Sequence, residues 1–116
     1  MASYSSEDAL KELKEIESKF LYKTENFVRD KNPEAIARIL LAIDNELFET
    51  ESEARRLRLS GQLDVNVYRT LIDGYFGLQR QVIELSEKYG LGRDVRDKYS
   101  FLMVEVSLAK RKEAYT

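Results

Sequence analysis

The fold is decided between residues 36 and 89, which read IARILLAIDNELFETESEARRLRLSGQLDVNVYRTLIDGYFGLQRQVIELSEKY. Apolar residues recur there in steps of four and three, on either side of the break at Ser60-Gly61-Gln62. The first stripe is Ile36, Leu40, Ile43, Leu47, Thr50, Ala54 and Leu57, and the second is Tyr68, Leu71, Tyr75, Leu78, Val82, Leu85 and Tyr89. Steps averaging about 3.5 residues keep one side of an α-helix apolar along its length. The stretch therefore predicts two antiparallel helices joined by a tight turn.

Capping and turn residues extend this prediction to the whole chain. Ser5 and the acids after it favour a helix start, and Asn32-Pro33 marks the next one. Glycines that suit helix ends stand at Gly61 and in Gly90-Leu91-Gly92, before possible caps at Asp64 and Asp94. We expect helices at about 6–30, 33–59, 65–89 and 94–114. Short connections make neighbouring helices antiparallel. The sequence thus predicts an all-α fold with one domain over residues 1–116, an antiparallel up-down-up-down four-helix bundle with coiled-coil-like packing.

Composition narrows the possible functions. The 116 residues include no cysteine and no histidine, and the net charge is −2. Without these two side chains, thiolate and imidazole metal sites and the common nucleophile–base pairs are absent. No glycine-rich phosphate loop or inward-facing acid pair stands out, so we expect no enzyme, no cofactor and no metal. We also expect no membrane span and a cytoplasmic location. Few Asn and Gln residues with many charged ones are typical of thermophilic proteins.

The helix expected at 65–89 has a second apolar row, formed by Val65, Ile72, Phe76 and Ile83. A stripe this wide indicates contact with two neighbouring helices. Gly74 and Gly77 lie within the helix, where each costs about 1 kcal/mol relative to alanine. Close approach of another helix would compensate for that cost, and a bound apolar ligand is the alternative.

The last helix has apolar residues on two sides. Its bundle-facing stripe is Val95, Tyr99, Leu102, Val106 and Ala109, and the opposite side carries Phe101, Val104, Leu108 and Tyr115. A helix that is apolar all round is normally surrounded. We therefore expect this side to pack on another chain, most simply on a second copy about a two-fold axis. Leu41 and Phe48 are expected to extend the surface. The alternative is irregular packing in which one molecule covers everything.

Cations are frequent near the ends of the second and fourth helices. If the bundle alternates direction, one end gathers Arg55, Arg56, Arg58, Arg69, Lys110, Arg111 and Lys112. Such a basic end would suit phosphates of RNA or DNA. The alternative is that these charges are solvated and simply complement the helix dipoles.

These patterns favour a non-enzymatic interaction protein, a scaffold or small assembly subunit that self-associates through the last helix. The alternative is a nucleic-acid-associated subunit that binds the phosphate backbone through its basic end.

Overall fold

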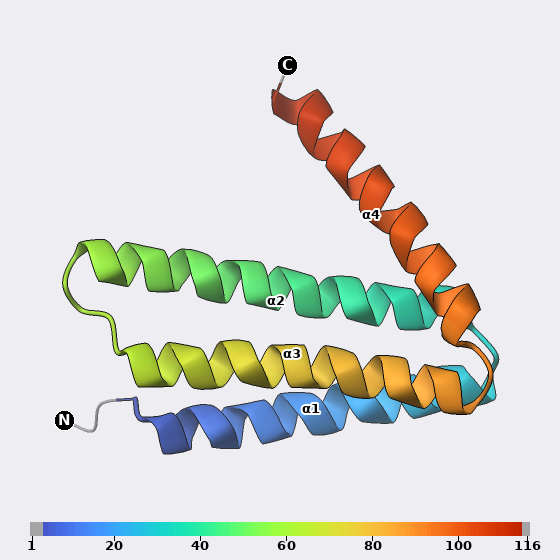
Figure 1. Ribbon diagram of the computed structural model, residues 1–116, viewed down its shortest axis with the longest axis horizontal. Helices are drawn as coiled ribbons and strands as arrows, with labels where there is room; N and C mark the ends of the chain where they lie inside the picture. The colour runs from blue at the N-terminus through green and yellow to red at the C-terminus, as the bar shows by residue number, and fades with distance from the viewer. Residues whose placement is uncertain (1–3, 115–116) are drawn as a thin grey trace.

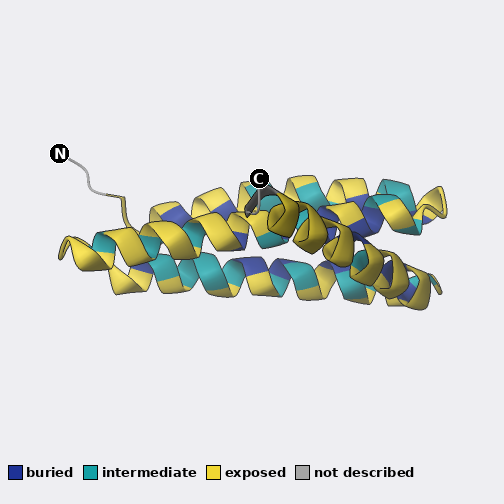
Figure 2. Cartoon of the chain, turned by 90° about the horizontal axis from the view of Figure 1, so that it is seen from above, coloured by how far each residue is buried: buried dark blue, intermediate teal, exposed yellow. Residues whose placement is uncertain are grey.

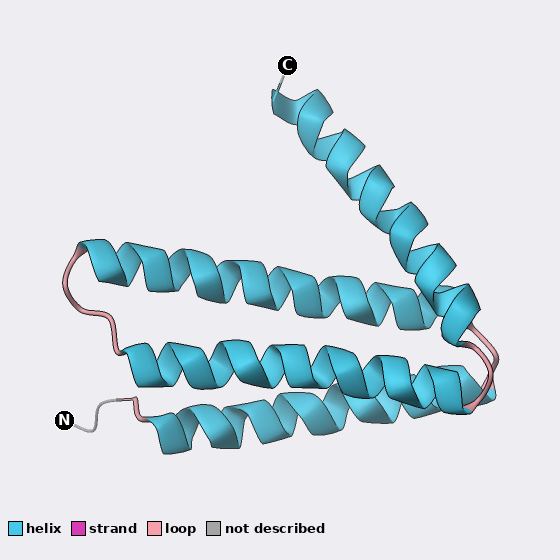
Figure 3. Ribbon diagram, in the orientation of Figure 1, coloured by secondary structure: helices cyan, strands magenta, loops and turns pink. Residues whose placement is uncertain are grey.

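The computed structural model describes the chain from Tyr4 to Ala114, with side chains up to Lys112. It forms four helices: α1 (Ser6–Arg29), α2 (Pro33–Leu59), α3 (Val65–Lys88) and α4 (Gly92–Ala114) (Figure 3). Residues 4–114 contain no strand. The prediction of an all-α fold with four long helices is confirmed, and each helix boundary lies within two residues of the expected one.

Side-chain caps begin the first three helices. The Ser5 hydroxyl accepts a hydrogen bond from the Asp8 amide at 3.2 Å, and the Asp8 carboxylate accepts one from the Ser5 amide at 3.0 Å. This capping box satisfies two amides that a helix start would otherwise leave unpaired. The Asn32 side chain caps α2 by accepting a hydrogen bond from the Ala35 amide. The Asp64 side chain caps α3 by accepting from the Asn66 and Val67 amides.

The start of α4 differs from the prediction. Its first helical hydrogen bond runs from the Val95 amide to the Leu91 carbonyl at 2.9 Å. The helix therefore begins at Gly92, and Asp94 lies in its first turn instead of capping it. The chain turns within the three residues between α3 and α4 because Gly90 has a φ of 76°, a conformation that glycine adopts without strain.

The three connections share one geometry. A residue with positive φ follows each helix, namely Lys31 (φ 51°), Gly61 (φ 74°) and Gly90 (φ 76°). The next amide then bonds back to a carbonyl of the last turn: Asn32 to Phe27, Gln62 to Leu57 and Leu91 to Ser86, each at 2.9 Å. This Schellman pattern uses carbonyls that would otherwise be unpaired. It also makes each connection short enough to join neighbouring helices.

The core lies between α1, α2 and α3, where α2 runs opposite to the other two (Figure 1). Its buried side chains include Leu13 and Val28 of α1, Ile36, Leu40, Ile43 and Leu47 of α2, and Tyr75, Leu78 and Val82 of α3. These belong largely to the predicted stripes. Contacts among the four helices are consistent with a four-helix bundle, although α4 contacts only α2 and α3 within residues 4–114.

The buried side of α1 includes Thr24 and Val28. Thr24 is fully buried and Val28 nearly so, whereas Lys23 stays exposed. Thr24 can be buried because its hydroxyl donates to the Phe20 carbonyl at 2.8 Å.

The second half of α4 leaves the other helices. Val95 and Leu102 are 1% and 5% exposed, but all residues from Met103 to Lys112 are exposed (Figures 1 and 2). The Cα radius of gyration is 16.3 Å, against about 13 Å for a compact domain of this length. Within residues 4–114, α4 therefore covers only one end of the core.

The sequence of α2 explains this divergence. The side of α2 toward α4 carries Leu41 and Phe48, but the next positions at helical spacing are Ser52 and Arg55. Between Phe48 and Leu59, this side of α2 thus offers α4 no apolar side chain whose burial would hold the two helices together.

Candidate protein-interaction surface

The side of α4 that faces away from the core carries three large apolar side chains, which we call the outer stripe. Phe101, Val104 and Leu108 are 62%, 58% and 59% exposed. At 100° per residue Val104 lies on the opposite side of the helix from the buried Val95 and Leu102, and Phe101 and Leu108 lie beside Val104 on one flank. Tyr115, the fourth predicted member, lies outside the described residues.

Apolar exposure continues on the other side of α4. Met103 and Val106 are 37% and 40% exposed, although Val106 belongs to the stripe expected to face the bundle. They line a cleft of about 340 Å³ between α2 and α4, the α2–α4 cleft, together with Leu41, Asp44, Asn45, Phe48 and Lys110.

Leu41 and Phe48, which we expected to extend the outer stripe, line this cleft instead. That expectation is wrong in its geometry, because both side chains face the inner side of α4. The Lys110 ammonium lies 5.5 Å from the centroid of the Phe48 ring, a cation–π contact across the cleft. The outer stripe and the α2–α4 cleft are therefore two separate apolar surfaces on opposite sides of one helix.

A partly buried polar junction links the first half of α4 to α2 and α3. Asp44 of α2 accepts hydrogen bonds from the Tyr99 hydroxyl of α4 and from the Gln79 amide of α3. Burial raises the pKa of Tyr99 to about 12, with further contributions from the hydrogen bond and the negative charge of Asp44. We did not predict this junction. Its one sequence signal is an acid within the apolar run around Leu41–Phe48.

The turn between α3 and α4 is tightly packed. Arg96 forms an ion pair with Glu87 across the turn. A Cβ atom at Gly92 would lie 2.6 Å from the Glu87 Cγ. Because Gly92 has no side chain, α4 can start close against the end of α3.

The predicted basic end is not assembled. Arg55, Arg56, Arg58 and Arg69 lie near the turn between α2 and α3. Lys110, Arg111 and Lys112 lie near the end of α4, and Figures 1 and 2 show this end away from that turn. The prediction that these two groups share one end is wrong, because it required α4 to run alongside α2 for its whole length. Arg56 is also paired with Glu53 at 3.8 Å.

The two helical glycines have different surroundings. A Cβ at Gly74 would lie 2.4 Å from a methyl carbon of Leu13, so α1 approaches α3 closely there, as predicted. Nothing lies within 4 Å of a Cβ at Gly77. The Leu13 side chain occupies the space beside Gly74 that the alternative of a bound apolar ligand would require.

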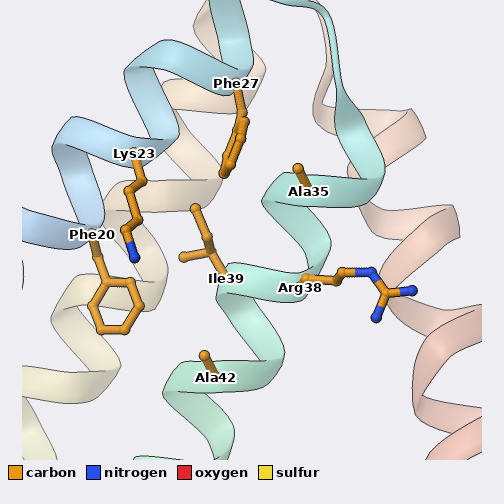
Figure 4. A pocket seen from close by; sticks show the side chains of 7 residues that line it. All are labelled: Phe20, Lys23, Phe27, Ala35, Arg38, Ile39 and Ala42. Carbon is orange, nitrogen blue, oxygen red and sulfur yellow. The ribbon is translucent and has the colours of Figure 1, made fainter.

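A groove of about 350 Å³ separates α1 from α2, where Ala35 and Ala42 leave room. Figure 4 shows the Lys23 side chain reaching into it between the rings of Phe20 and Phe27. A second hollow, of about 410 Å³, has an acidic lining that includes Glu12, Glu46, Glu49 and Glu53. Neither was predicted from the sequence.

Two further findings concern residues 4–114. Their acidic side chains form no group of three or more that could hold a metal ion. Their helices include none with the length and apolar content needed to cross a bilayer.

In the comparisons with known proteins, no family model, curated protein or solved structure matches this chain.

Proposed function

We propose that this protein is a non-enzymatic cytoplasmic interaction protein, a scaffold or small assembly subunit that self-associates through α4. The observation that carries the proposal is the run from Phe101 to Leu108, in which five large apolar side chains are at least 37% exposed. Residues 4–112 leave this segment uncovered on two sides.

The physical argument concerns free energy of burial. Covering a side chain of this size contributes about 1.5–3 kcal/mol relative to leaving it in water. Soluble monomers rarely expose several such residues together, and patches of this kind usually mark interaction sites. A second copy is the simplest partner, because one patch related to itself by a two-fold axis covers both copies.

Sedimentation velocity at several protein concentrations tests the proposal. We expect a dimer at micromolar protein concentrations, because a small interface forms a weak complex. The double variant Val104→Glu/Leu108→Glu should be monomeric with unchanged helical circular dichroism, because both residues are exposed and support no core packing.

The matched control is Ser18→Glu/Gln81→Glu, which adds the same charge at exposed positions of α1 and α3. It should dimerise like the original chain. A monomer of the unaltered protein throughout this concentration range would refute self-association.

We make no second proposal of nucleic-acid binding from the basic residues. The two groups expected to bind phosphate together lie apart, so neither gains the charge density that the nucleic-acid hypothesis required.

A further inference from the structure

The outer stripe continues past its apolar centre into charged residues at the same spacing. Asp94 and Asp97 precede Phe101 by seven and four residues, and Arg111 follows Leu108 by three. These three charged side chains are exposed. No ion pair within residues 4–112 includes any of them. One edge of α4 thus has an acidic beginning, an apolar centre and a basic end.

We infer that two copies of α4 pair antiparallel through the outer stripe, with the two-fold axis passing between Leu102 and Met103. The inference rests on the proposed self-association and adds its orientation and register. In this arrangement Phe101 lies opposite Val104 of the second copy, and Asp94 lies opposite Arg111 of the second copy. Each contact occurs twice because of the symmetry.

The residues beside the stripe select the same register. Lys98 and Glu105 are exposed and lie on one flank of the stripe, seven residues apart. In antiparallel helix pairs, residues on equivalent flanks face each other, and their charges set orientation and partner choice. The proposed register puts Lys98 opposite Glu105 of the second copy. A shift of one heptad would instead oppose Glu105 to itself and Lys98 to Lys112.

Parallel pairing is disfavoured by charge. It would place Asp97 beside Asp97 and Arg111 beside Arg111 of the second copy, and like charges at such positions are repulsive.

Charge exchange tests the register directly. Lys98→Glu alone and Glu105→Lys alone should each weaken dimerisation about tenfold near 0.1 M salt, because two attractive contacts become repulsive. The double variant Lys98→Glu/Glu105→Lys should restore the original dissociation constant. Lys14→Glu, an exposed reversal on α1, is the control and should change it less than twofold.

Orientation is tested by crosslinking, which is unambiguous here because the chain has no native cysteine. Ser100 and Ser107 lie on the other flank of the stripe and face each other only in antiparallel pairs. A mixture of Ser100→Cys and Ser107→Cys proteins should therefore form mainly mixed disulfides on mild oxidation.

The outcomes separate the two claims. A dimer that forms mainly 100–100 and 107–107 disulfides would be parallel and would overturn this inference while leaving self-association intact. A dimer without rescue in the charge-exchanged double variant would overturn the register. A monomeric protein would refute the proposed function itself.

Discussion

Alanine at Gly74 and alanine at Gly77 should change stability in different directions, although the two positions are one turn apart on α3. Replacing a glycine in a helix interior by alanine gains about 1 kcal/mol. At Gly77 that gain is unopposed because a Cβ atom meets nothing within 4 Å. We therefore expect Gly77→Ala to raise the free energy of unfolding by about 0.5–1 kcal/mol.

At Gly74 the gain is opposed by overpacking. The new Cβ would lie 2.4 Å and 2.9 Å from the two methyl carbons of Leu13, whose side chain is only 7% exposed and has little space to turn away. Overpacking of this kind costs about 1–3 kcal/mol. The net expectation for Gly74→Ala is a loss of up to about 2 kcal/mol, a difference of about 1–3 kcal/mol from the Gly77 variant.

Urea unfolding followed by circular dichroism measures both variants, and thermal unfolding should show a separation of about 4 °C per kcal/mol. In a Leu13→Ala background the obstruction is gone, so Gly74→Ala should then be stabilising. If Gly74→Ala stabilised the original chain as much as Gly77→Ala does, the close contact of α1 with α3 would be refuted.

Two other predictions concern the junction and the first connection. Tyr99→Phe should lower stability by about 1–2 kcal/mol, because Asp44 loses one of its two donors. The raised pKa of Tyr99 contributes stability below pH 10 that is lost as pH rises through about 12, so urea titrations of the variant should show a smaller alkaline decline. Lys31→Gly should raise stability by about 1 kcal/mol in the same assay, because Lys31 has a φ of 51°, and an unchanged midpoint would contradict this.

Interactions between residues close in the sequence determine where the helices begin and end. Ser5, Asn32 and Asp64 cap the helices that the sequence assigned to them, and the glycines after α2 and α3 have the positive φ expected of them. These features depend on residues within one turn of each other, so spacing and residue type suffice to predict them. The buried stripe of α2 from Ile36 to Leu47 could be predicted for the same reason, since one helix face carries it.

Other features depend on what the neighbouring helices provide. Helical periodicity shows that Phe101, Val104 and Leu108 share a side of α4, but it does not give the angle at which α4 leaves α3. The contacts that α4 makes at its start involve other helices: Gly92 packs against Glu87 of α3, and Tyr99 donates to Asp44 of α2, 55 residues earlier in the chain.

The sequence by itself determined four capped helices and which residues share a helix side, because those properties arise within each helix. Only the tertiary structure decided that α4 diverges, that the basic groups lie apart and that Leu41 and Phe48 face a cleft. The physical reason is that helix direction depends on the apolar surface a neighbour offers along its length, and α2 offers α4 no apolar side chain on this side between Phe48 and Leu59.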